Sequence, residues 1–269
     1  DGEITKRPLT VTANNVTKTY DGVAWSGGNG LSYSGFASGE DASVLTGTVV
    51  WGGTAQGARN AGSYSLSASG YDTSGNYSFA YVDGTLTVNK AALTLSAVSE
   101  TKVYDATTTS LGTVQVSGLQ VGDTIGNLTQ AFDNKAVGSG PSRLNVVAAY
   151  TLKDGSNADM SGNYNVTFDG AGTAMVGAVA SSSLTKQGSG TLNLLSASSY
   201  SGGTTLSAGT LGVYNNTALG SGTLTAANST NVIILYYIKT RSLATVALSK
   251  NKGISTPSSN HHICASTTI

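Results

Sequence analysis

Short runs of this chain alternate apolar and polar residues with a period of two. Residues 9–12 (LTVT), 63–67 (SYSLS) and 85–88 (TLTV) each carry this pattern. Such alternation predicts β-strands that bury one face. Asp-Gly pairs, which favour tight turns, separate the runs and begin at Asp21, Asp83, Asp154 and Asp169. The chain is therefore predicted to be all-β.

Several sequence blocks occur twice in the chain, in the same order. Residues 17–21 (TKTYD) match residues 101–105 (TKVYD) 84 positions later. A Gly-Asn-Tyr triplet also recurs, at residues 75–77 and 162–164. A repeat of this length can bury a modest core of its own, and short strands at intervals of about ten residues suggest an Ig-like sandwich.

We therefore predict two small β-sandwich repeats in tandem, with a β-grasp topology as the alternative that the same strand pattern allows. The first covers residues 6–89 and the second covers residues 90–176. Residues 1–5 (DGEIT) resemble residues 83–87 (DGTLT), with which the first repeat closes. They are expected to be the end of an upstream repeat that is missing from this sequence.

Residues 177–227 have a different repeated sequence pattern. The triplet Gly-Thr-Leu recurs there at Gly190, Gly209 and Gly222, with few charged residues between the copies. Short strands separated by glycine turns are what a stack of parallel coils requires, with Leu and Val buried against the next coil. This segment is predicted to be a short right-handed parallel β-helix.

Residues 228–269 do not continue this pattern. Glycine becomes rare, acidic residues are absent, and the only histidines and the only cysteine of the chain occur there, as His261, His262 and Cys264. We interpret this segment as an atypical tail that is either frameshifted or disordered.

The repeated blocks resemble the MBG and YDG repeats, which are mostly-β, glycine-rich modules of bacterial haemagglutinin-like adhesins. The resemblance covers residues 1–176. It is carried by the Lys-x-Tyr-Asp blocks, by the Ala-Gly-x-Tyr block at residues 61–64, and by the closing Asn-Tyr and Lys-Ala-x-Leu-Thr blocks.

The second repeat departs from the first at Ala106, which stands where the first has Gly22, and it lacks the Ala-Gly-x-Tyr block. Its residues 132–138 (FDNKAVG) look like the YDG variant. Residues 184–225 resemble the autotransporter-associated β-strand repeat of type V secreted passengers. These resemblances imply a bacterial adhesin of the autotransporter or haemagglutinin-like kind, and no catalytic residue comes with them.

Charge changes the picture of possible partners. Only 10% of the 269 residues are charged and the net charge is zero, whereas about 25% are charged in typical soluble domains. Without a basic stripe, no nucleic-acid partner is expected. The longest apolar run, residues 232–238, is far shorter than the roughly 20 residues of a membrane-spanning helix.

Catalytic and metal chemistry are not indicated, so we predict no enzyme activity, no metal and no cofactor. The only histidines are adjacent in the tail, where no scaffold positions them. Glu40 and Asp41 adjoin, whereas two glycosidase carboxylates must face each other across a cleft. We assign the aspartates to turn capping.

Aromatic residues give one hint of binding. Trp25 and Trp51, which occur only in the first repeat, are candidates for stacking on sugar rings, although core packing is the stronger reading for large aromatics. Tyr20 and Tyr104 of the repeated blocks are expected to be core or corner tyrosines.

These observations predict a structural stalk or display segment of a bacterial cell-surface or secreted adhesin. It would be a monomer within a longer chain, outside the cell or on the outer-membrane surface. Its partners would be host, matrix or neighbouring-cell surfaces, including glycans. Two alternatives remain open: a carbohydrate-binding module using Trp25 and Trp51, and an accessory region of a secreted polysaccharide-active enzyme.

Overall fold

The computed structural model is all-β, as predicted, and divides into two compact units, Asp1–Lys90 (unit 1) and Ala91–Ile269 (unit 2). The residues that it describes are 1–72, 75–98, 100–132, 135, 137, 143–145, 150–169, 173–176, 179, 181–227, 230–234 and 246–248. The histidines and the cysteine of the tail, and most of the block at residues 132–138, lie outside these residues.

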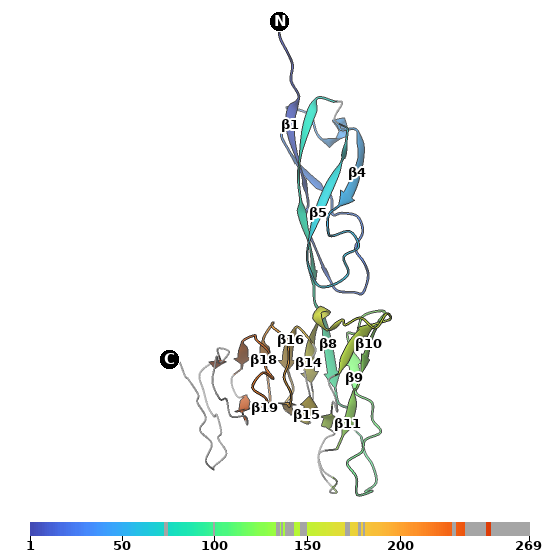
Figure 1. Ribbon diagram of the computed structural model, residues 1–269, viewed down its shortest axis with the longest axis vertical. Coiled ribbons are helices and arrows are strands. Elements are labelled where there is room, and N and C mark those ends of the chain that lie inside the picture. The colour runs from blue at the N-terminus through green and yellow to red at the C-terminus, as the bar shows by residue number, and fades with distance from the viewer. Residues whose placement is uncertain are drawn as a thin grey trace. The chain divides into compact units, whose positions relative to one another are not determined.

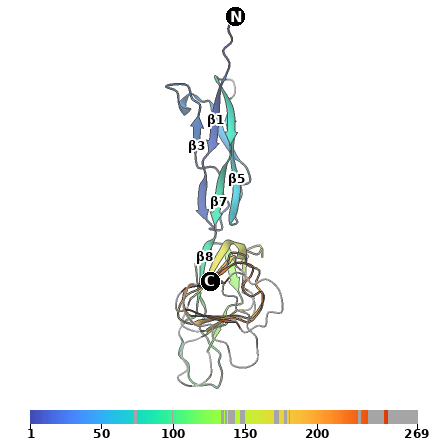
Figure 2. The same cartoon turned by 90° about the vertical axis from the view of Figure 1, so that its left-hand side faces the viewer.

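Unit 1 is a sandwich of two small sheets (Figures 1 and 2). The first sheet has the order β3-β1-β6 and the second β2-β7-β5-β4. The strands are β1 (Arg7–Ala13), β2 (Val16–Thr19), β3 (Leu31–Ser34), β4 (Gly47–Gly52), β5 (Gly62–Tyr71), β6 (Tyr77–Val82) and β7 (Gly84–Asn89).

The period-two pattern sets which side chains fill this sandwich. Along β1, Leu9 and Val11 are completely buried, and Leu66 of β5 and Leu86 of β7 are also at zero exposure. Their polar neighbours in sequence lie on the outer faces, since successive side chains of a strand point to opposite sides. The apolar residues of the alternating runs therefore form the core of unit 1.

Unit 2 begins with strands that correspond to those of unit 1. Its first sheet opens with the order β9-β8-β14, and the register is conserved: Leu9 pairs with Phe79 in unit 1, and Leu93 pairs with Val166 in unit 2. The strands are β8 (Ala91–Ser96), β9 (Gln115–Ser117), β10 (Asp123–Gly126), β11 (Thr129–Ala131), β12 (Arg143–Asn145), β13 (Thr151–Asp154), β14 (Tyr164–Asp169) and β15 (Thr173–Val176).

Parallel strands then extend two sheets of this second repeat, whereas β10 and β13 form a separate two-stranded sheet. One sheet continues from β14 through β16, β18, β20 and β22, and the other from β15 through β17, β19 and β21. The added strands are β16 (Ser183–Lys186), β17 (Thr191–Leu194), β18 (Thr204–Leu206), β19 (Thr210–Val213), β20 (Leu224–Ala226), β21 (Asn231–Ile234) and β22 (Val246–Leu248). Seen end on, successive coils superpose (Figure 2).

Both ladders cross residue 176, where the sequence places a boundary between two domains. In unit 1 the closing strand β7 pairs in parallel with β2. In unit 2 the corresponding strand β15 pairs in parallel with β17 instead. Residues 100–103, which correspond to β2, form no strand.

This difference explains the fate of the two repeated tyrosines. Tyr20 follows β2 and is 1% exposed, which confirms its predicted place in the core, whereas Tyr104 is 60% exposed, so that prediction is wrong. Within the described part of the chain, the Tyr104 segment is not paired into a sheet, so its ring is not directed into a sheet core.

A buried lysine interrupts the apolar interior of the stack. Lys186 is 2% exposed and lies in register between Phe168 and Leu206. Its ammonium group donates hydrogen bonds to the carbonyl oxygens of Gln187 and Gly188, the latter at 2.8 Å. Burial lowers the pKa of Lys186, while the charge of Asp169 opposes that shift.

Gly118 supplies the first test of this fold. Its φ is +91°, and a Cβ there would lie 2.1 Å from the carbonyl oxygen of Ala92. We expect Gly118→Ala to lower the free energy of unfolding of unit 2 by about 2 kcal/mol or more, because a positive φ alone costs a residue with a side chain about 1–2 kcal/mol. Denaturant unfolding measures this loss.

Gly155→Ala is the matched control. A Cβ at Gly155 meets nothing within 4 Å and its φ is not in the positive range. Equal stability losses in the two variants would contradict the backbone geometry assigned to Gly118.

Candidate functional site

Trp25 lies in a loop of unit 1 that is held by internal hydrogen bonds. Its indole Nε1 donates to the carbonyl oxygen of Gly27 at 3.1 Å, and its backbone N–H donates to Ala58. The side chain of Gln56 closes the same loop, because it accepts from the N–H of Gly27 and donates to its carbonyl oxygen, both at 2.9 Å. The half-buried indole is thus part of the local structure.

Trp51, on β4, is also half-buried. The backbone of Gly28 lies against its ring, since a Cβ on Gly28 would fall 2.2 Å from the indole Cε2. One part of the indole surface is therefore covered by protein. Among the ring contacts of the described residues, none joins Trp25 to Trp51, so the pair does not form one continuous platform.

A larger aromatic group in unit 1 was missed by the sequence analysis. It consists of Tyr33, Phe36, Tyr71, Tyr77, Phe79 and Tyr81, hereafter the aromatic strip, whose neighbouring ring centroids lie 5.4–6.2 Å apart. The signal was present in β6, where aromatic residues alternate with small ones (YSFAYV). Desolvation, together with the hydrogen bond to the Tyr33 hydroxyl, raises the pKa of Tyr71 to about 12.

The Lys-x-Tyr-Asp block forms a small clasp. In unit 1, Lys18 Nζ lies 2.7 Å from Asp21 Oδ1 and donates to the carbonyl oxygen of Val23 at 3.0 Å. The same Asp21 oxygen accepts from the N–H of Val23 at 2.9 Å. The block therefore holds one tight turn through a side-chain pair.

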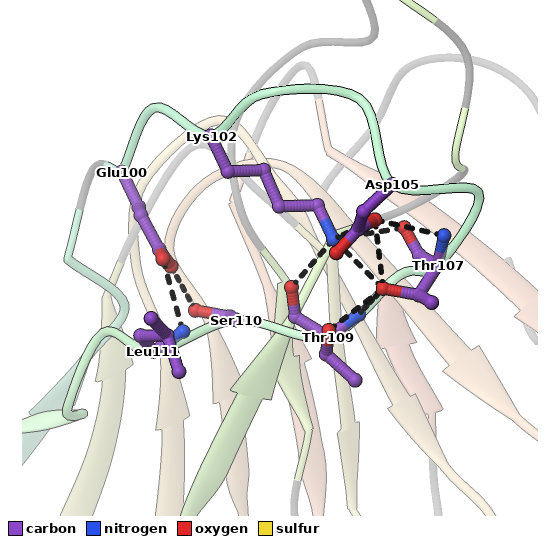
Figure 3. A network of polar contacts seen from close by, with 7 residues as sticks. All are labelled: Glu100, Lys102, Asp105, Thr107, Thr109, Ser110 and Leu111. Atoms are coloured by element: carbon purple, nitrogen blue, oxygen red, sulfur yellow. Dashed lines mark hydrogen bonds and ion pairs between the residues drawn. The ribbon is translucent and has the colours of Figure 1, made fainter.

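Unit 2 repeats this clasp with more bonds (Figure 3). Lys102 Nζ lies 2.9 Å from Asp105 Oδ1 and donates to the carbonyl oxygens of Thr107 and Thr109, each at 2.9 Å. Asp105 accepts from the N–H of Thr107, as Asp21 does from Val23. The hydrogen bond from Lys102, followed by those from Thr107, lowers the pKa of Asp105 to about 2.

Glu100 anchors the other side of this loop (Figure 3). Its carboxylate accepts from the hydroxyl of Ser110 and from the backbone N–H groups of Leu111 and Gly112, at 2.9 and 3.1 Å for the last two. The Ser110 bond is the main reason why the pKa of Glu100 is lowered. These charged groups are thus engaged in holding the loop.

A second repeated motif joins a tyrosine to a carboxylate. Tyr164 donates its hydroxyl to Asp123 at 2.6 Å and accepts from the N–H of Gln120 at 2.9 Å. In unit 1, Tyr77 donates to Glu40 and accepts from the N–H of Ala37 at 3.0 Å. This contact gives the physical reason why the Gly-Asn-Tyr and Gly-Glu/Gly-Asp blocks occur together in both repeats.

The carboxylates that could serve chemistry therefore have structural partners. Glu40 is bonded to Tyr77, and Asp41 caps a short 3-10 turn by accepting from the N–H of Ser43 at 2.8 Å. Within the described part of the chain, no three His, Cys, Asp or Glu side chains gather as a metal site would require. No described helix is both long and apolar enough to cross a membrane.

The turn inside each clasp gives a testable difference. Gly22 has φ +77° and its counterpart Ala106 has φ +61°, a conformation that strains a residue with a Cβ. We expect Ala106→Gly to raise the free energy of unfolding of unit 2 by about 1 kcal/mol, and Gly22→Ala to lower that of unit 1 by about the same amount. Thermal unfolding of each variant measures these changes in stability. Destabilisation by Ala106→Gly, or stabilisation by Gly22→Ala, would contradict the shared turn geometry.

The clasp also predicts a pH dependence. Because the pKa of Asp105 is depressed to about 2 in the folded protein, its contribution to stability is present above about pH 4, the unfolded value, and is lost as the pH falls toward 2. Lys102→Met should raise the pKa of Asp105 toward the ordinary value, as measured by NMR titration of the carboxyl carbon. Lys18→Met is the control and should leave Asp105 unchanged; an unmoved Asp105 in Lys102→Met would contradict the clasp.

Comparisons with known families agree with the order of these modules. Residues 9–87 match the MBG domain (YGX type), residues 89–174 match the YDG domain, and residues 184–213 match the passenger-associated-transport-repeat. No curated protein and no solved structure matches the chain.

The three family matches confirm the resemblance seen in the sequence. Each covers its own part of the chain, in the order that the sequence blocks predict. The chain is thus similar to the MBG, YDG and passenger-associated repeats, which together fit an autotransporter-type passenger segment of a secreted or surface-displayed protein.

Proposed function

We propose that this chain is a structural display segment of a bacterial surface or secreted adhesin, whose task is to hold a binding region away from the cell. One observation carries the proposal. Two sheets of the second repeat pass without a break into the parallel stack, so that the YDG-type module and the transport repeat form one hydrogen-bonded body.

The use of polar groups supports the same function. Several charged and phenolic side chains of the repeated motifs bond to one another or to backbone groups, as in the Lys102–Asp105 and Tyr164–Asp123 pairs. Internal contacts of this kind, which occur in both repeats, position loops and sheet edges. Adhesion to host, matrix or neighbouring cells is then a property of the longer protein to which this segment contributes reach.

The carbohydrate-binding alternative has less support. Stacking on a sugar needs an open aromatic face, whereas Gly28 covers part of Trp51 and the indole of Trp25 is tied to its own loop. The accessory role in a polysaccharide-active enzyme also has less support. The candidate carboxylates have structural partners, since Glu40 accepts a hydrogen bond from Tyr77 and Asp41 caps a 3-10 turn.

A binding array of glycans and immobilised matrix proteins tests the proposal. We expect the folded full chain to show no saturable binding to any glycan. The matched variant is Trp25→Ala combined with Trp51→Ala, with circular dichroism confirming that both proteins are folded. Saturable glycan binding that is lost in the double variant would replace the display role by a lectin-like one.

A further inference from the structure

Among the described residues of unit 1, no strand neighbours the outer edge of β6. β6 ends the order β3-β1-β6, so that β1 is its hydrogen-bonded neighbour on one side only. The corresponding strand of unit 2, β14, has β8 on one side and β16 on the other. Unit 2 therefore shows within the same chain what an occupied edge of this kind looks like.

Side chains along the β6 edge of unit 1 are more exposed than their counterparts on β14 of unit 2, in agreement with this difference in strand pairing. In unit 2, Val166 and Phe168 are 0% and 1% exposed beneath the added strands. Their counterparts in unit 1, at the same register against β1, are Phe79 and Tyr81. Phe79 is half-buried and Tyr81 is 37% exposed. The surface that β16 helps to cover in unit 2 is thus open to solvent in unit 1.

The open edge lacks the features that usually protect sheet edges. Natural edge strands carry charges, prolines or bulges that prevent pairing with another chain. β6 reads YSFAYV and has none of the charged or proline residues. The edge strand β2 of the other sheet, by contrast, carries Lys18 in its ion pair with Asp21.

The aromatic strip beside this edge is held in place before anything binds. The rings of Tyr71 and Phe79 are stacked with centroids 5.4 Å apart, and the ring of Tyr81 follows at 6.0 Å from Phe79. The Tyr81 hydroxyl accepts a hydrogen bond from the backbone N–H of Tyr71 at 3.1 Å. Fixed aromatic side chains lose little entropy on binding.

We propose that the outer edge of β6 is a docking site for an extended peptide strand of a partner protein. The strand runs parallel to β6 and adds to the sheet β3-β1-β6. Main-chain hydrogen bonds provide affinity, and alternate side chains provide specificity. The β16 strand indicates the pattern: Leu184 lies opposite Val166 and the stem of Lys186 opposite Phe168, so the partner places aliphatic side chains opposite Phe79 and Tyr81.

A partner protein fits this edge better than a second copy of the chain. Two β6 edges related by a twofold axis would pair antiparallel, whereas the occupied counterpart of this edge is parallel. Within the chain, β16 already has neighbours on both sides, β14 and β18. The site is independent of the proposed display role, which needs no partner at this edge.

The test uses the full chain and a fluorescent peptide with the sequence of residues 182–187 (SSLTKQ). We expect saturable binding by fluorescence anisotropy, no binding of a scrambled peptide, and slower hydrogen exchange of the β6 amides on addition of the peptide. Tyr81→Glu should weaken binding at least about tenfold, because it places a charge at the edge. Tyr214→Glu is the matched control, since Tyr214 is equally exposed at 37%.

Three outcomes would overturn the proposal. The first is the absence of binding by a chain whose fold is intact. The second is exchange protection at strands other than β6. The third is a concentration-dependent oligomer without peptide that Tyr81→Glu abolishes, because that result would make a second copy the occupant. Loss of binding in Tyr81→Glu with retention in Tyr214→Glu would support the site.

Discussion

Parallel backbone pairing on two sheets of the second repeat is the interaction on which the rest of unit 2 depends. β16 adds to β14 and β17 adds to β15, and each later strand pairs with the one before it. A few coils alone would expose both of their ends, and repeat stacks require a terminal module that covers the first coil. The sandwich strands β8 and β9, with β11 and β12, occupy that position.

The same pairing explains how two similar repeats acquire different structures. β2 occupies the edge of its sheet in unit 1, and β17 takes the corresponding place in unit 2. The displaced residues 100–103 keep the Lys–Asp clasp of the block but lose the strand. A local motif therefore preserves its turn even where its long-range partner has been exchanged.

The features that depend on the local sequence pattern could be predicted from the sequence. Alternation such as Leu9-Thr10-Val11 predicted the strands and their buried faces, and the recurring blocks predicted two related repeats. The Lys–Asp clasp and the Tyr–carboxylate contact were not predicted, although their residues stand in those blocks. The exposure of Tyr104 could not be predicted, because its local sequence matches that of Tyr20 and only long-range pairing separates them. The aromatic strip was missed because Tyr33 and Tyr71, which lie on other strands, join the aromatic residues of β6 only in the folded structure.

The two architectures differ in the length that each residue provides. Leu184, Thr204 and Leu224 occupy equivalent positions in successive coils, so each of these coils uses 20 residues, while neighbouring strands are only about 4.8 Å apart. The ten-residue strand β5 spans one sandwich and, at about 3.3 Å per residue, is about 33 Å long. A sandwich repeat of 84 residues therefore provides about 0.4 Å of length per residue and the coils about 0.24 Å per residue. The sandwich is the longer element per residue, but by less than a factor of about two.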